Sequence, residues 1–355
     1  MPTRRSHRSA SFSPVAAPPD IQDRVCGYEG KTVAVTGASG YIGTALTAAL
    51  MNTAARTLAV TRQPAYAALS DPARLNLLTA DVRDRACWDE IVGRADVVFH
   101  LAGNTSVYAA AENPDESHRS TVQPVAHLIA AARTAGRCLR VVYASTATVY
   151  GLTDRLPVNE DVEPRPATVY DLHKRSAEQQ LQQASAEGVL DSVSLRLANV
   201  YGPSAGSSAA ADRGVLTTIA KRALGRCDLP LYGGGRYIRD YVYIDDVVRA
   251  FLTIGTRSDL TRYAFNVASG RGITIRDAFS LVAERAARVT GHESHVCEVP
   301  WPDDADPIEF RNFVGDIRSI SSACGWTPCV SLTEGVDRLI EALQNTDNAT
   351  PRTNM

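Results

Sequence analysis

The chain has 355 residues, 45% of them hydrophobic and 21% charged, with a formal net charge of −2. This apolar fraction is ample for a folded core and excludes a chain that is disordered throughout. A net charge near zero argues against a protein that coats nucleic acid, and the sequence lacks a run of the roughly 18 apolar residues that a membrane span requires. We therefore expect a cytoplasmic protein with no nucleic-acid partner and no membrane partner.

The seven cysteines indicate reduced thiols. Their number is odd and no two of them form a CxxC pair, whereas zinc sites and disulfide frameworks use paired or closely spaced cysteines. We expect no metal site.

The two ends of the chain differ in composition from the rest. Residues 1–28 are rich in Ser, Pro, Ala and Arg, and residues 1–19 hold three arginines and no acidic residue. Prolines break helices, and no apolar stretch of the kind found in signal peptides occurs here. We predict a disordered basic tail over residues 1–28 and a second tail over residues 346–355.

Short β-branched runs alternate with helical stretches between these tails. The predicted strands are 31–36, 58–61, 75–79, 97–101, 139–143 and 193–197, and the predicted helices are 41–51, 84–92, 122–134 and 167–186. Strands separated by helices form parallel βαβ units with right-handed crossovers. We predict an α/β fold: a doubly wound parallel sheet over residues 29–200, to which some later segments return, and a smaller substrate-binding lobe, mainly over residues 201–345.

The sequence GASGYIG at residues 37–43 lies between the first predicted strand and the first predicted helix. Glycines allow a tight turn and close approach of the backbone to a pyrophosphate, which the helix N-terminus attracts. The spacing is GxxGxxG instead of the commoner GxGxxG, but the strand–turn–helix context is the required one. We predict a dinucleotide site that includes Gly37, Ser39, Gly40, Tyr41, Ile42 and Gly43.

The end of the second predicted strand bears on the choice of cofactor. An NAD site usually has Asp or Glu there, to bind the ribose 2′-hydroxyl. This sequence has Thr61 and Arg62 instead, and an arginine pairs well with a 2′-phosphate that a carboxylate would repel. We predict NADP (NADPH) as the cofactor, with NAD as the alternative.

Tyr170 and Lys174 are four residues apart on one face of a predicted helix. A free tyrosine has a pKa of about 10, and a nearby ammonium or a positive nicotinamide favours the phenolate. Ser145 and Thr146 follow the fifth predicted strand, at the edge of the sheet where ligands of parallel sheets bind. This combination indicates acid–base catalysis by Tyr170.

The order of these motifs resembles that of the extended short-chain dehydrogenase/reductases, and among them the NAD-dependent epimerase/dehydratase family, which acts on nucleotide sugars. The resemblance covers residues 30–345. Its motifs are GASGYIG at 37–43, DV at 81–82, HLAG at 100–103, STATVYG at 145–151, YDLHK at 170–174, NVYGP at 199–203, RDYVYIDD at 239–246 and GWTP at 325–328.

The resemblance implies a role for each matching residue. The implied catalytic residues are Thr146, Tyr170 and Lys174. The implied further cofactor contacts are Asp81 and Val82 at adenine, and Leu101, Ala102, Gly103 and Ser145 on the nicotinamide side, together with Tyr170 and Lys174 themselves. The implied substrate contacts are Thr105, Ser106, Thr146, Asn199 and Arg239, the last two at the diphosphate of a nucleotide sugar. The family also implies a homodimer, formed by the helices near 117–134 and 167–186.

Three positions depart from the family pattern. The family's dehydratases have Asp-Glu directly after the catalytic Thr, where this chain has Ala147 and Thr148, so 4,6-dehydration is not expected. Ser120 stands where an Asn is usual. Arg311 is a weak match for the arginine that often closes over the nucleotide.

Reduction and epimerisation use the same Tyr, Lys and hydroxyl group to move hydride to or from C4 of a hexose. An epimerase returns the hydride to the opposite face and keeps its NAD, whereas a reductase consumes a 4-keto sugar and draws on NADPH. Because of Arg62, we predict NADPH-dependent reduction of the C4 keto group of a nucleotide 4-keto-6-deoxyhexose, with dTDP as the expected nucleotide. The alternatives are an NAD-dependent nucleotide-sugar 4-epimerase, another NADP-linked reductase and, more remotely, a non-catalytic NADP-binding sensor.

Overall fold

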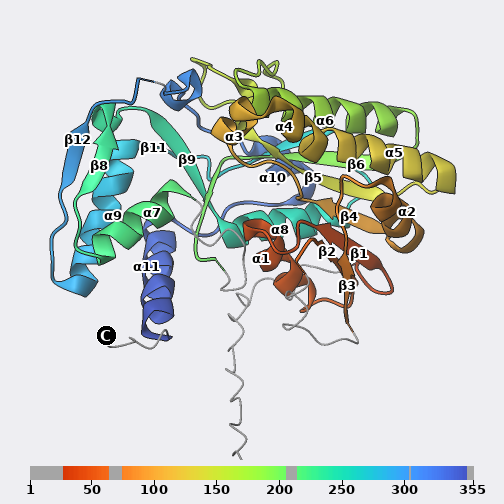
Figure 1. Cartoon of the computed structure of the whole chain (residues 1–355), viewed down its shortest axis with the longest axis horizontal. Helices are drawn as coiled ribbons and strands as arrows, with labels where there is room; N and C mark the ends of the chain where they lie inside the picture. The colour runs from red at the N-terminus through yellow and green to blue at the C-terminus, as the bar shows by residue number, and fades with distance from the viewer. Residues whose placement is uncertain (1–26, 64–73, 205–213, 304, 350–355) are drawn as a thin grey trace, which may run out of the picture.

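The computed structural model describes residues 27–63, 74–204, 214–303 and 305–349 (Figure 1). Residues 1–26 of the predicted basic tail and residues 350–355 of the second predicted tail lie outside the described residues.

Seven parallel strands form the main sheet, in the order β10-β6-β5-β4-β1-β2-β3. Their bounds are β1 Thr32–Thr36, β2 Arg56–Thr61, β3 Leu75–Thr79, β4 Val97–His100, β5 Arg140–Thr146, β6 Asp191–Leu197 and β10 Ala264–Val267. The predicted doubly wound α/β sheet is confirmed, and β10 brings a segment from beyond residue 200 into it. From β1 the chain moves outward to β2 and β3, and then crosses back to β4 on the other side of β1. Such a reversal opens a ligand crevice at the carboxyl ends of the strands.

Helices cover both faces of this sheet (Figure 1). One face carries α1 Tyr41–Leu50 and α8 Ile244–Gly255, and the other carries α2 Arg85–Arg94, α5 Gln123–Ala135 and α6 Val169–Ala186. Within β1, Val33 and Val35 belong to the first core and Ala34 to the second. Both faces of β1 are therefore apolar, which is why this strand reads as a continuous hydrophobic run.

Two short helices, α3 Val107–Glu112 and α4 Pro114–Thr121, fill the connection between β4 and α5, where the sequence pattern predicts no separate strand or helix. Each starts with a side-chain cap. The Ser106 hydroxyl accepts from Ala109 N, and the Asn113 amide oxygen accepts from Glu116 N. Such caps satisfy N–H groups that a helix leaves open in its first turn.

The C-terminal part of the chain adds smaller sheets beside the main one (Figure 1). One consists of β7 Asn199–Tyr201, β9 Ile238–Tyr243 and β11 Gly272–Thr274, and the other of β8 Leu229–Tyr232 and β12 Val296–Val299. The helices of this part are α7 Val215–Leu224, α9 Ile275–Thr290, α10 Arg318–Cys324 and α11 Leu332–Ala349. Among the described residues, short 3-10 helices are η3 Ala147–Tyr150, η4 Gly233–Gly235 and η5 Pro307–Phe310. Within the described ranges, no helix combines the length and the apolar character needed to cross a membrane.

A buried ion pair fixes α6 to the sheet. Arg196 of β6 donates from Nε and Nη2 to the two carboxylate oxygens of Glu178, at 3.0 and 2.8 Å, and the Ser145 hydroxyl of β5 donates to Glu178 Oε1 at 2.5 Å. The side chains of Arg196 and Glu178 are 4% and 3% exposed. Removal of one partner therefore leaves a charge in the core without compensation.

We predict that Glu178→Ala lowers the free energy of unfolding by about 3–5 kcal/mol, because Arg196 stays buried without its carboxylate. The matched control is Glu90→Ala, which breaks the exposed pair of Glu90 with Arg94 on α2 and costs at most about 1 kcal/mol. Urea denaturation measures both, and equal losses in the two variants would contradict the role given to the buried pair.

Candidate active site

The Gly-rich turn connects β1 to α1 at the carboxyl edge of the sheet. A Cβ at Gly43 would lie 2.1 Å from Gly37 O, and one at Gly37 would lie 2.9 Å from Ala102 N, with Gly37 also at a φ of +69°. Only glycine fits this packing. The N-terminus of α1 at Gly40 has no side-chain cap and no acidic residue in its first turn, so its free N–H groups suit a pyrophosphate. The turn therefore fits the dinucleotide that the sequence predicts.

Hydroxyl groups hold the strand ends beside this turn. Ser39 and Thr61 share a hydrogen bond of 2.8 Å. Thr36 Oγ1 accepts from the backbone N–H groups of Leu101 and Ala102, at 3.2 Å each. Its own proton is then directed to His100 Nδ1, 2.7 Å away. Gly103 follows at a φ of +156°. A Cβ at Gly37 would lie 2.9 Å from Ala102 N, so segment 101–103 lies beside the turn.

Tyr41 connects the turn to the C-terminal part of the chain, since its hydroxyl donates to Gly202 O at 2.9 Å. Ile42 is half-buried and packs against the core. Val82 O accepts from the Trp88 indole N–H at 2.7 Å, which holds the segment after β3 against α2.

Helix α6 brings Tyr170 and Lys174 to the ends of β4 and β5. Its N-cap is Thr168, whose hydroxyl accepts from Asp171 N at 3.1 Å. Lys174 is 4% exposed, donates to Ala144 O at 2.8 Å, and lies 6.0 Å from the centre of the Tyr170 ring. Burial lowers the pKa of Lys174 to about 8, against the attraction of Glu178.

The pKa of Tyr170 is set by burial and by its neighbours Asp171, Thr146 and Arg311. Burial and the neighbouring Asp171 carboxylate raise the pKa of Tyr170 to about 12, while Thr146 and the charge of Arg311 act in the opposite direction. The three residues predicted to be catalytic thus lie together. Ser145 differs from them, because its hydroxyl points to Glu178.

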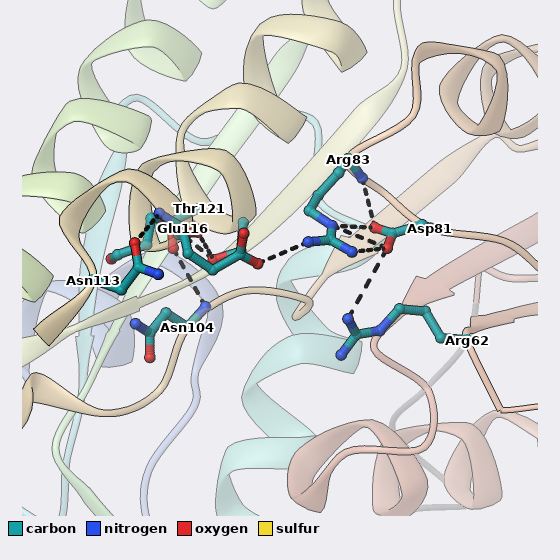
Figure 2. A network of polar contacts seen from close by, with 9 residues as sticks. Arg62, Asp81, Arg83, Asn104, Asn113, Glu116 and Thr121 are labelled. Carbon is teal, nitrogen blue, oxygen red and sulfur yellow. Dashed lines mark hydrogen bonds and ion pairs between the residues drawn. The ribbon is translucent and has the colours of Figure 1, made fainter. Parts of the chain in front are cut away.

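The segments after β2 and β3 carry a network of charges (Figure 2). Arg83 donates to both carboxylate oxygens of Asp81 and pairs with Glu116 at 2.7 Å. The Arg83 guanidinium lowers the pKa of Asp81. Arg62 lies 4.0 Å from the same carboxylate and is 72% exposed. The sequence analysis missed Arg83, because nothing in its spacing marks it as a partner of Asp81.

The predicted substrate residues are placed differently from one another. Arg239 is 3% exposed, and its guanidinium donates to the backbone oxygens of Ile238, Glu309 and Arg311. The Arg311 side chain donates to Asn199 Oδ1 at 3.5 Å, and its charge reaches Tyr170 and Asp171. Arg311 therefore lies at the candidate active site, while Arg239 supports the segment that carries it.

Asn199 also lines a pocket of about 180 Å³ together with Val200, Tyr201, Gly214, Val215, Leu216 and Tyr241. Thr105 is exposed, and Ser106 N donates to the Asn104 side chain at 2.8 Å. Across the described ranges, no group of three His, Cys, Asp or Glu side chains is arranged to hold a metal ion.

Fold and site together define an extended short-chain dehydrogenase/reductase. The model of the NAD dependent epimerase/dehydratase family matches residues 33–268, and the chain belongs to this family.

Two curated relatives and one solved structure extend this finding. A UDP-glucose 4-epimerase of Mycolicibacterium smegmatis is 27% identical over 88% of this chain and 98% of its own length. A dTDP-4-dehydro-6-deoxyglucose reductase of Escherichia coli is 28% identical over 72% of this chain and 78% of its own length. The structure of MoeE5 in complex with UDP-glucose and NAD is 28% identical, has a TM-score of 0.76, and covers 89% of this chain and 99% of that one.

We predict that Lys174 makes stability rise with pH between about pH 8 and pH 10.5. In this window the unfolded chain holds a proton that the folded chain has lost, so the free energy of unfolding increases, by up to about 3 kcal/mol. Urea denaturation of the wild type and of Lys174→Met across this range measures the difference, with the exposed Lys221→Met as control. If the free energies of unfolding of the wild type and of Lys174→Met differ by the same amount at every pH, the pKa of Lys174 is not lowered.

Proposed function

We propose that this protein is a nucleotide-sugar 4-epimerase that keeps its NAD. The observation that carries the proposal is the meeting of Thr146, Tyr170 and Lys174 with the Gly-rich turn at one edge of the sheet. The relatives support epimerisation better than the reduction that the sequence analysis predicts, because the UDP-glucose 4-epimerase aligns over nearly its whole length.

The cofactor would bind along the edge where β1, β4 and β5 end. The uncapped start of α1 would hold its pyrophosphate, Asp81 and Val82 would contact its adenine, and segment 101–103 would line its nicotinamide side. The bound cofactor would supply hydride transfer to and from C4 of the sugar. Lys174 is placed to hold the nicotinamide ribose, and its charge favours the Tyr170 phenolate.

The chain's own residues move the proton. Tyr170, as phenolate, takes the proton of the C4 hydroxyl while the hydride leaves, and gives it back when the hydride returns to the opposite face. Thr146 holds the same oxygen by a hydrogen bond. Asn199 and Arg311 would contact the diphosphate; the hydrogen bond between their side chains supports this, because a guanidinium can bind two phosphate oxygens at once. Arg239, Thr105 and Ser106 stay predictions as substrate contacts.

The direct test is incubation of the purified chain with UDP-glucose and with dTDP-glucose, without added cofactor, followed by NMR of the product. Interconversion with the galactose epimer supports the proposal. If no epimer forms and the protein instead consumes NADPH with a dTDP-4-keto-6-deoxyhexose, the epimerase proposal is wrong and the protein is a reductase.

We predict that Tyr170→Phe lowers kcat by about 10²–10⁴-fold, because the general base is lost, while the affinity for the dinucleotide stays within about twofold. Tyr263→Phe is the control, since this tyrosine is 42% exposed. Steady-state kinetics and cofactor titration measure the two quantities, and full turnover in Tyr170→Phe would refute the catalytic assignment.

NADPH-dependent 4-ketoreduction is the second candidate, and Arg62 favours it. The guanidinium is largely exposed at the end of β2, where an NAD site would have an acid. The Asp81 carboxylate 4.0 Å away opposes it, because a 2′-phosphate would bring further negative charge beside an ionised acid. The positive charges of Arg62 and Arg83 are balanced by the negative charges of Asp81 and Glu116. This cluster therefore has no net positive charge.

We predict that Arg62→Asp reduces the affinity for NADP relative to NAD by about tenfold or more, since one charged hydrogen bond is replaced by repulsion. Arg94→Asp, on the exposed face of α2, is the control. Binding of both dinucleotides to each variant gives the ratio, and an unaltered ratio would remove the support for NADP.

We further propose a homodimer formed by α5 and α6. A surface pocket lined by Ala126, Ile129, Ala130 and Arg133 of α5 and by Gln180, Gln183 and Ala184 of α6 supports it, because small residues allow helices to approach closely. Sedimentation at micromolar concentration tests it, and a monomer under these conditions would refute it.

A further inference from the structure

The ammonium of Lys174 is almost fully withdrawn from water. Its side chain is 4% exposed, and its Nζ donates to Ala144 O at 2.8 Å. A Cβ at Gly103 would lie 3.7 Å from the same Nζ, so the bare backbone of Gly103 leaves the ammonium open toward segment 101–103. A buried cation needs other groups to compensate for the water that it has lost.

The face of an aromatic ring lies against this ammonium. Tyr143 of β5 comes directly before Ala144, and Lys174 Nζ stands over its ring at 4.9 Å from the ring centre. The face of such a ring is electron-rich and attracts a cation within about 6 Å. Tyr143 is 1% exposed, so little water is present to weaken the attraction. The ring of Tyr170 lies further away, at 6.0 Å.

Two further rings support the ring of Tyr143. His100 of the neighbouring strand β4 is its register partner, and the two ring centres are 5.5 Å apart. Trp88 of α2 packs edge-on against His100, with 5.1 Å between the ring centres. Trp88, His100 and Tyr143 therefore form a buried aromatic column that ends at Lys174.

The histidine in the aromatic column is neutral. His100 Nδ1 faces the Thr36 hydroxyl at 2.7 Å. Burial, with the charge of Lys174 as a second cause, lowers the pKa of His100 to about 3. A protonated His100 would repel the ammonium, so the neutral ring is the form that suits a cation at the end of the column.

The ring of Tyr143, and not its hydroxyl, is the part that can act on Lys174. The hydroxyl is buried without a hydrogen-bond partner among the described residues, and a buried hydroxyl in this situation costs free energy. Burial also raises the pKa of Tyr143, so the phenol keeps its proton and supplies no negative charge.

We propose that Tyr143 is a positioning residue that holds the Lys174 ammonium against its ring and keeps it charged beside Tyr170. The inference deepens the proposed function and rests on the role given there to Lys174. Burial by itself favours the neutral amine. A neutral Lys174 would no longer favour the Tyr170 phenolate, so the ring of Tyr143 protects the charge on which the base depends.

The titratable groups around Lys174 act in known directions. Burial lowers the pKa of Lys174 to about 8, and Glu178, one turn further along α6, acts against this. Glu178 is itself paired with two arginines. The groups on the elements that pack here are Arg175 and Arg196 at Glu178, His100 of β4, His173 with His118 of α4, and Asp171 with Arg311 near Tyr170. The variants below leave all of these in place.

Variants at position 143 separate the ring from the hydroxyl. Tyr143→Phe keeps the ring, whereas Tyr143→Leu removes it. Phe99→Leu is the matched control, because it removes a buried ring of β4 that packs on Phe251 in the other core. Increasingly fluorinated phenylalanines at position 143 weaken the negative ring face while they keep its shape, and they decide the question if Tyr143→Leu does not fold.

The measured quantity is the pKa of the Lys174 ammonium in the full chain. The sequence has three lysines, Lys31, Lys174 and Lys221, so carbon NMR of isotope-labelled lysine gives few signals, and Lys174→Met assigns the relevant one. The second readout is the pH profile of UDP-glucose turnover, whose alkaline limb should follow the same pKa.

We expect this pKa to stay within about 0.3 units in Tyr143→Phe and Phe99→Leu, and to fall by about 1 unit or more in Tyr143→Leu, the size of a buried cation–π contact. It should fall stepwise along the fluorinated series. A merely structural role would lower the stability of Tyr143→Leu and leave the pKa unchanged, and that result would overturn the proposal. A fall in Tyr143→Leu with none in the fluorinated series would overturn it too, because the ring face would then not be the cause.

The NMR titration needs no sugar. If no nucleotide sugar is turned over, the proposed function fails, while the titration still decides whether Tyr143 keeps Lys174 charged.

Discussion

The attachment of α6 to the carboxyl edge of the parallel sheet is the constraint on which the site depends. Tyr170 and Lys174 come from a helix, whereas Thr146 and the Gly-rich turn come from strand ends, so chemistry requires the helix to be held in one position. Two buried contacts provide this: Lys174 with the backbone of β5, and Glu178 with Ser145 and Arg196. Both lie in the core, where hydrogen bonds to charged groups are strong and their loss is expensive.

In this fixed position, the groups around Tyr170 shift its pKa in opposite directions. Burial and Asp171 favour its hydroxyl form, whereas Arg311 favours the phenolate. A base needs to accept the proton during oxidation of the sugar and release it during reduction.

Much of the fold could be predicted from the sequence because periodicity and turn chemistry are local. Strand β3 has the predicted bounds Leu75–Thr79, and α6 begins two residues after the predicted start, at its Thr168 cap. Helices α3 and α4 were not predicted as separate elements, because segments of six and eight residues are too short to show an apolar period. The grouping of Thr146, Tyr170 and Lys174 was predictable because parallel strands end at one edge.

Contacts that depend on long-range packing could not be predicted from the sequence. Nothing local distinguishes Arg239, which supports backbone oxygens, from Arg311, which faces Tyr170, because the difference arises from how residues 309–311 pack against β9. From the sequence alone Arg62 is expected to be an unpaired cation, and only the structure shows Asp81 beside it. Asp171 is visible in the sequence next to Tyr170, but only the structure brings Thr148 into contact with it.

The central claim is that this edge of the sheet removes hydride from C4 of a nucleotide sugar and returns it to the same carbon. Incubation of the NAD-loaded protein with UDP-glucose deuterated at C4, followed by NMR, tests it most directly. The account predicts an epimer that keeps its deuterium at C4. Replacement of the deuterium by solvent hydrogen would show that C4 loses a proton instead of a hydride, and would contradict it.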